Sequence, residues 1–313
     1  MRAYYIRITS PTDGKVLKFY TSFNPDGSTN GKALRVEVDI PVYSYETPGG
    51  LAKVKVYGVD YPDIQAQSDL NGADIEIYGG MAKGLPLANP AQAGVLVKGT
   101  VFQCFGNWLG RETSLELFIV AKAPKANLAY KWPKGGSLES AVRQVLNIAY
   151  PGASVTGGFD PSLVYTEEQP FAYQNLAQLG KFVFDTSKAI NTSPTYLGAK
   201  IVSTAKGFLL YDGTTRPLAK QISYLDLVGN ATWLESQVMQ FMAVMRADLT
   251  PGDIIQMPQG ANQINQQNSF SQFRNKTAFQ GLFFLRSLRH LGDSRQLSAE
   301  AWVTVVDAIP VAS

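Results

Sequence analysis

The sequence contains one cysteine and one histidine among 313 residues. With a single cysteine, Cys104, no disulfide can form within the chain, so the fold does not depend on an oxidising compartment. Zinc and non-haem iron sites usually need two or more histidine or cysteine ligands, so we predict no metal site. Cys104 lies in the apolar run 101–105, and we expect it to be a small buried hydrophobic residue.

The sole histidine, His290, would have to be the base of any Ser–His–Asp arrangement. It stands between a predicted strand and the turn 291–293, where we expect a hydrogen-bonded structural histidine. Phosphate-binding loops are also lacking: the segment 134–137 precedes a predicted helix, but no strand is expected before it and its spacing is not that of a P-loop. We therefore predict no catalytic residue and no cofactor.

Long hydrophobic runs and a strong charge imbalance are absent as well. No segment reaches the roughly 18 apolar residues that span a bilayer, and no apolar core follows Arg2, so we expect no signal peptide and folding in a cytoplasm. The net charge of +3 is too near neutral to indicate a nucleic-acid partner. At 45% hydrophobic and 17% charged residues, the chain can fill the cores of two or three domains.

The first 125 residues show the pattern of half-buried strands. Polar and apolar residues alternate strictly in 35–40, 53–57 and 74–78, which places the valines and isoleucines on one face of each strand. Further strands are expected at 96–102 and 115–120. Turn signals separate them at 24–27, 48–50, 71–72 and 79–80. Short strands with frequent turns favour a tube-like antiparallel β-barrel over 1–125.

The periodicity changes between residues 126 and 220, where we predict a small α/β domain. Ser137 can cap a helix whose apolar residues follow the i, i+3, i+4 spacing up to Ala149, and Pro151 ends it. A second helix is predicted over about 172–184, and a hairpin at 200–203 and 207–211.

Strand character returns in 221–313, where we predict a second tube-like barrel. The run 233–247 fits either a helix or strands; we favour strands, because the turn 250–253 leads into another strand at 254–257. The segment 258–277, rich in Gln and Asn, is expected to be a long exposed loop. The sequence thus predicts a mainly β protein with two β-barrel domains flanking a middle α/β domain.

Carboxylate pairs and basic clusters offer little further chemistry. A glycosidase needs two carboxylates across a cleft, but Glu167 and Glu168 stand in a polar segment where we expect a solvated turn. Four aspartates are expected at turns: Asp60, Asp63, Asp69 and Asp74. The densest group of arginines is interpreted as a solvated or subunit-facing surface: Arg286, Arg289 and Arg295.

Several motifs in order resemble bacteriophage tail baseplate hub proteins of contractile-tailed phages. Residues 69–80 followed by 96–101 look like the "L-x-G", "I-x-I-x-A-G" and "F-x-G-x-I" elements of their first barrel. Residues 207–210 are similar to their "Gly-Leu-Leu" hairpin, and 249–255 to their "L-x-P-G-D-x-I" turn. The segment 289–304 resembles their "H-x-G-D-x-R … W-x-T" ending. Together the matches cover roughly half of the chain.

The resemblance implies a homotrimeric hub in the virion tail, assembled in the host cytoplasm. Three subunits with two barrels each would form a pseudo-sixfold ring that joins a sixfold tail tube to the central spike, contacts other baseplate proteins and surrounds a lumen through which DNA passes. The function would be mechanical and non-enzymatic. Three alternatives stay open: another tail structural protein such as a distal tail protein or spike adaptor, a baseplate cell-wall hydrolase, and a carbohydrate-binding receptor protein.

Overall fold

The computed structural model describes residues 2–42, 51–82, 89–122, 124–194, 196–205, 207–214, 218–235, 237–258, 279 and 281–311. The turn predicted at 48–50 and all but Pro258 of the loop predicted at 258–277 lie outside these residues. Within them, thirteen strands join into one sheet. Eleven follow the order β14-β15-β18-β17-β3-β4-β7-β6-β5-β1-β2; in addition, β16 pairs with β17, and β13 pairs with β16. The protein is therefore mainly β, as the alternation predicts.

The first half of the sheet consists of strands whose inward residues are apolar. Its strands are β1 (Arg2–Thr9), β2 (Val16–Thr21), β3 (Arg35–Val42), β4 (Ala52–Tyr57), β5 (Asp74–Met81), β6 (Gly94–Leu109) and β7 (Glu112–Val120). In β3 and β4 the alternating residues Val36, Ile40 and Val54 are fully buried, while the charged residues between them face outward. Neighbouring strands in this half are antiparallel.

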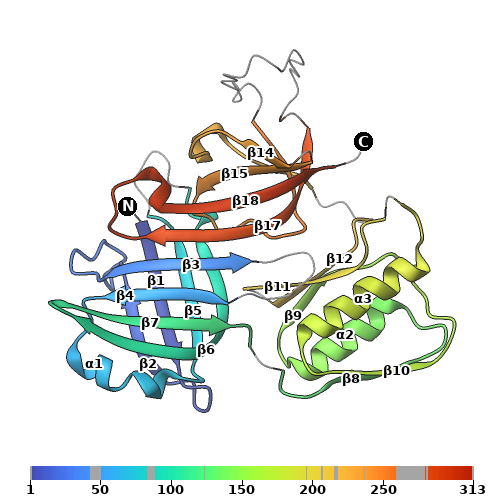
Figure 1. Cartoon of the computed structure of the whole chain (residues 1–313), viewed down its shortest axis with the longest axis horizontal. Helices are drawn as coiled ribbons and strands as arrows, with labels where there is room; N and C mark the ends of the chain where they lie inside the picture. Colours follow the sequence, from blue (N-terminus) through green and yellow to red (C-terminus); the bar gives the residue numbers. More distant parts are fainter. Residues whose placement is uncertain are drawn as a thin grey trace.

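The second half of the sheet lies against the first and pairs with it directly. Its strands are β13 (Lys220–Gln221), β14 (Thr232–Glu235), β15 (Val238–Val244), β16 (Ile254–Gln256), β17 (Leu282–Asp293) and β18 (Trp302–Pro310). The strands predicted in 233–247 are confirmed. Figure 1 shows β17 of this half, in red, side by side with β3 of the first half, in blue, as their antiparallel pairing requires.

The middle of the chain folds beside the large sheet around a core of its own. Helices α2 (Leu138–Ala149) and α3 (Leu176–Ile190) pack with two small sheets: β8 (Leu128–Trp132) with β10 (Gln169–Tyr173), and β9 (Ser154–Gly157) with β11 (Lys200–Thr204) and β12 (Gly207–Tyr211). Figure 1 shows both helices on the side of this unit away from the large sheet. The Ser137 hydroxyl accepts a hydrogen bond from the backbone N–H of Ser140, which confirms the predicted cap of α2.

Several local predictions were wrong. Residues 291–293 continue β17 rather than forming the predicted turn. The second helix begins at Leu176 rather than 172, because residues up to Tyr173 pair with β8 and Asn175 caps the helix. The glycines at 79 and 80 lie inside β5 rather than at a turn. Glycine is needed at these positions because a Cβ atom there would collide with Leu96 and Ala93. A short helix, α1 (Tyr61–Gln65), and a 3-10 turn, η1 (Gln67–Leu70), occupy the segment for which only turns were expected.

The two halves of the sheet repeat one pattern of strands, down to its irregularities. Strand β17 pairs with β16 and β18 as β6 pairs with β5 and β7. A bulge falls between Leu285 and Ser287 of β17 and between Val101 and Gln103 of β6. The pairings of the described residues close no ring, however, so the two tube-like barrels of the prediction are not confirmed.

Backbone hydrogen bonds before these bulges repeat as well. The N–H of Gly72 donates to the carbonyl of Val101 at 2.8 Å, and the N–H of Gly252 donates to that of Leu285 at 3.0 Å. In return, Val101 and Leu285 donate to the residues that follow the two glycines, at 2.9 Å in both halves. The turn predicted at 71–72 and the turn predicted at 250–253 are therefore equivalent parts of one repeated unit.

Trp302 of β18 reaches from the second half into the core of the first. It is 2% exposed, and its indole N–H donates to the carbonyl of Gly80 at 2.8 Å. We predict that Trp302→Ala lowers the free energy of unfolding by about 3–5 kcal/mol, because it removes a large buried side chain and leaves a cavity. Leu297→Ala, at a fully exposed residue, is the control and should change it by less than about 0.5 kcal/mol. Chemical denaturation measures both, and equal effects would contradict the assigned role of Trp302.

Candidate functional site

The two residues weighed for single-residue chemistry, Cys104 and His290, are both buried in the sheet. Burial raises the pKa of the Cys104 thiol to about 11, which disfavours the reactive thiolate. His290 is 2% exposed inside β17, and its Nδ1 lies 2.9 Å from the Thr304 hydroxyl of the adjacent strand. Burial lowers the pKa of the imidazole to about 4, so it is neutral at physiological pH. Both residues fit the structural roles predicted for them.

The carboxylates considered for a glycosidase lie apart from any shared cleft. Glu167 and Glu168 are exposed before β10, and Glu168 pairs with exposed Lys131 at 2.7 Å. Asp63 of α1 pairs with Lys18, and Asp74 of β5 pairs with Lys122. Among the described residues, no group of three or more His, Cys, Asp or Glu side chains is arranged to hold a metal ion.

The remaining sequence candidates also have structural partners. A strand, β8, does precede the segment 134–137, contrary to expectation, but the loop is closed by backbone bonds to Tyr165 rather than left open for phosphate. Arg289 binds both carboxylate oxygens of Asp39, and Arg295 donates to the carbonyl of Ala33. No helix in the described part of the chain is long and apolar enough to cross a membrane.

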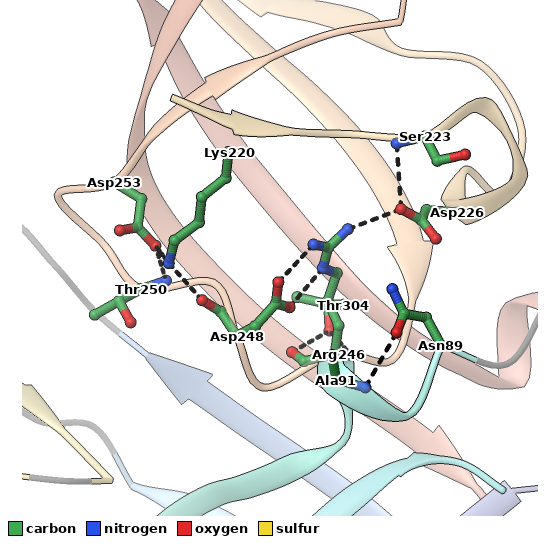
Figure 2. Close-up of polar contacts among 10 residues, drawn as sticks. All are labelled: Asn89, Ala91, Lys220, Ser223, Asp226, Arg246, Asp248, Thr250, Asp253 and Thr304. Atoms are coloured by element: carbon green, nitrogen blue, oxygen red, sulfur yellow. Dashed lines mark hydrogen bonds and ion pairs between the residues drawn. The ribbon is translucent and has the colours of Figure 1, made fainter. Parts of the chain in front are cut away.

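A buried cluster of charges, absent from the sequence-based predictions, lies at the junction between the halves. Figure 2 shows the Arg246 guanidinium between Asp226 and Asp248: it donates two bonds of 2.7 Å to Asp248 and one of 3.1 Å to Asp226. The Arg246 side chain is only 3% exposed. Its backbone N–H donates to the Thr304 hydroxyl at 3.0 Å. Arg246 thus connects three parts of the chain: its guanidinium binds a 3-10 turn through Asp226 and the segment after β15 through Asp248, and its backbone N–H binds strand β18.

A second ion pair continues this cluster. The Lys220 ammonium donates to the Asp253 carboxylate at 2.6 Å and also to the carbonyl of Asp248, as Figure 2 shows. Asp253 in turn accepts a bond from the backbone N–H of Thr250. Burial raises the pKa of the Asp253 carboxyl above its ordinary value, although the Lys220 ammonium opposes that change. The turn predicted at 250–253 is therefore closed by a partly desolvated ion pair.

The cluster borders a cavity of about 460 Å³ that lies between the halves. The N–H of Ala247 donates to the carbonyl of Gln92 in the β5–β6 connection at 2.7 Å. Beside it, Met245 is buried in the core of the first half. Since the cations facing the cavity are paired with carboxylates, the arrangement supports a structural junction. The sequence signal was a lone Arg-Ala-Asp, 246–248, among apolar residues.

Loss of the Arg246 guanidinium should be costly, because Asp226 and part of Asp248 would be left as buried charges. We predict that Arg246→Met lowers the free energy of unfolding by about 3–5 kcal/mol. Arg289→Met is the matched control: it breaks a similar two-oxygen contact, but that pair is 55% and 39% exposed and should contribute about 0–1 kcal/mol. Urea denaturation measures the free energy of unfolding of both variants. A loss for Arg289→Met as large as the loss for Arg246→Met would contradict the assigned role of Arg246.

We predict that the burial of His290 makes the free energy of unfolding depend on pH. Its pKa is lower in the folded state than the ordinary 6.5, so the unfolded chain binds more protons between about pH 6.5 and 4. Stability should therefore fall as the pH falls through this window. By pH 4 the loss should reach about 3 kcal/mol relative to His290→Gln, which retains all the carboxylates. Parallel slopes for the two proteins in denaturation between pH 4 and 7 would refute this.

Comparisons with known proteins find likeness in structure alone. No family model matches the sequence, and no curated protein matches it. A 43 kDa tail protein of prophage MuSo2 from Shewanella oneidensis superposes with a TM-score of 0.55 at 7% identity, covering 99% of this chain and 98% of that one. A tail protein from Neisseria meningitidis gives 0.51 at 10% identity, covering 99% and 96%.

A third similar structure comes from a secretion machine. It is an Escherichia coli component of the type VI secretion system, described as structurally similar to the phage T4 tail proteins gp27 and gp5. Its TM-score is 0.52 at 10% identity, with coverage of 90% of this chain and 74% of that one. Identities this low establish a shared fold and nothing finer. The chain has, over nearly its whole length, the fold of these phage tail proteins, as the ordered motifs predicted.

Proposed function

We propose that the chain is a structural component of a bacteriophage tail baseplate, the hub that joins the tail tube to the central spike. The observation that carries this proposal is the likeness to the Shewanella tail protein, which spans nearly all of both chains. The ordered sequence motifs support it independently, because they were found without reference to any structure. The hub would function in the virion tail after assembly in the host cytoplasm.

The proposed domain layout is two tube-like β-barrels, 1–125 and 221–313, flanking a small α/β domain, 126–220. Three clusters of buried apolar residues support it. One is centred on the first half and receives Met245 and Trp302 from the second, one lies wholly between Leu128 and Leu210, and one fills the second half. The repeated strand pattern of the halves supports two related barrels.

The proposed partners are two further copies of the chain, the spike protein, the tube protein and other baseplate proteins. Two related halves in each of three copies give six similar units, which suits the sixfold tube implied by the resemblance. The described likeness of the Escherichia coli protein to the T4 tail proteins gp27 and gp5 supports a place in a tail-like assembly. DNA would meet the chain only in passage through the lumen.

We propose no enzymatic activity. The sequence-based candidates support this, since Glu167 and Glu168 are exposed and His290 is buried within a strand. The leading alternative is another tail component, such as a distal tail protein or spike adaptor, because it would share the fold. A cell-wall hydrolase would need peptidoglycan turnover that is lost on mutating Glu167 or Glu168.

Copy number separates the hub from the other tail components. We predict that light scattering of the purified chain gives a trimer, or a monomer that forms a three-to-three complex with the spike protein encoded in the same genome. The physical reason is that two similar units per subunit need three subunits to match a sixfold tube. A monomer or hexamer that is indifferent to the spike protein would contradict the hub and favour another tail component.

A further inference from the structure

Among the described residues, one strand pairing joins the two repeated units. Strand β3 pairs with the second half of β17, from Leu288 opposite Val42 to Asp293 opposite Glu37. Ion pairs flank this contact on the surface, with Arg289 bound to Asp39 at 2.6–2.7 Å and Arg35 bound to Asp293 at 2.8 Å. The second unit thus uses the C-terminal half of its β17 to bind the β3 of the first unit.

The repeat identifies the equivalent strands on the other side of each unit. One row across the first half runs Asp39, Lys53, Phe118, Gln103 through β3, β4, β7 and β6. The matching row in the second half runs Thr232, Gln240, Asp307, Ser287 through β14, β15, β18 and β17. Strand β14 is therefore the equivalent of β3, and residues 103–109 of β6 are the equivalent of 287–293 of β17.

Among the described residues, neither β14 nor residues 103–109 of β6 pair with a further strand in the way that β3 pairs with β17. Strand β14 pairs only with β15. Residues 103–109 pair only with β7, and on their other edge side chains cover two backbone N–H groups: Asn71 accepts from Cys104 at 2.8 Å, and Gln67 accepts from Gly106. A partner there would therefore meet side chains of β6 and the α1–η1 segment rather than an open backbone edge.

Both places are apolar and exposed. The β6 surface is formed at this edge by Phe102, Phe105, Trp108 and Leu109, which are 66%, 41%, 62% and 76% exposed; Trp108 lies on the opposite face of the strand from Phe105 and Leu109. The β14 surface consists of Trp233 and Leu234, at 40% and 55%. In the equivalent contact inside the chain, the positions of Phe105 and Leu109 are held by the charged residues Arg289 and Asp293. The covered contact therefore has charged residues at these two positions, whereas the two open places have aromatic and aliphatic residues. Exposed aromatic and aliphatic residues are expected at the core of an interface.

We propose that the β6 surface of one copy binds the β14 surface of a second copy through side chains, at the place equivalent to the one where β17 and β3 meet within the chain. The two surfaces differ, so the contact is head-to-tail and each copy keeps one of each free for the next. Such a contact closes a ring when its rotation allows. Closure at three copies, giving six similar units, rests on the proposed hub function; the contact itself rests on the repeat.

Two substitutions block the two surfaces separately. Trp108→Glu disables the β6 surface, and Leu234→Glu disables the β14 surface. Each places a charge in the contact and should weaken self-association by about 30-fold or more, the loss typical of a central anchor residue. Leu218→Glu is the matched control, because Leu218 is 95% exposed and belongs to neither surface. Thermal unfolding followed by circular dichroism identifies any variant that fails to fold, and Leu109→Glu then replaces Trp108→Glu.

Sedimentation of the variants, alone and mixed, tests the direction of the contact. We expect the wild-type chain and Leu218→Glu to form the closed oligomer and the two blocked variants to be monomers. An equimolar mixture of the blocked variants should form a dimer, because one copy supplies an intact β14 surface and the other an intact β6 surface. A self-complementary contact would not give this result.

Three results would overturn the contact: a wild-type chain that is monomeric at every concentration, blocked variants that remain oligomeric, or a mixture that stays monomeric. The hub proposal would survive any of them if the spike protein still gathered three copies. Conversely, a dimer in the mixture together with a wild-type ring of another size would leave the contact intact and contradict the hub.

Discussion

The pairing of β3 with β17 is the interaction on which the rest of the architecture depends. It joins residues about 250 positions apart in the chain and turns two local sets of strands into one sheet. The other contacts between the halves gather around it. Trp302 enters the first core from the strand next to β17, and His290 is buried within the paired stretch of β17 itself. Because these contacts share the same strands, weakening one should loosen the whole junction.

The chemistry of the junction explains why its charges are structural. Arg246 and Lys220 lie in a partly desolvated region where an unpaired cation would be unstable, and each is held by carboxylates of the same unit. The middle unit has its own core, and Tyr211 of its strand β12 stacks on Phe284 of β17.

Much of the fold could be predicted from the sequence because its signals are local. Alternation in 35–40 and 53–57 identified half-buried strands, Ser137 identified a helix cap, and Pro251-Gly252 identified a turn. The failures have non-local causes. The two glycines of β5 are needed for close approach by Leu96 and Ala93, which no neighbouring residue reveals. The cross-chain pairing and the partners of Arg246 depend on residues distant in sequence.

The candidate chemistry was anticipated mainly through what the sequence lacks. One histidine and one cysteine left little room for a catalytic or metal site, and both residues are buried where packing accounts for them. Motif order added the resemblance to tail hubs, and the chain shares its fold with a prophage tail protein over nearly its whole length. The strand-rich beginning and end of the chain predicted two barrels, but the shared register and bulges could not be read from the sequence, because equivalent residues differ, as Phe105 and Arg289 do.

The most direct test of the account is electron cryomicroscopy of the tails produced from the genome that encodes this protein. The account predicts three copies in a single ring at the spike end of the tube, with β3 and β17 paired within each copy and the β6 and β14 surfaces in contact between copies. Tails that lack the protein, or that carry it as six copies away from the spike, would contradict it.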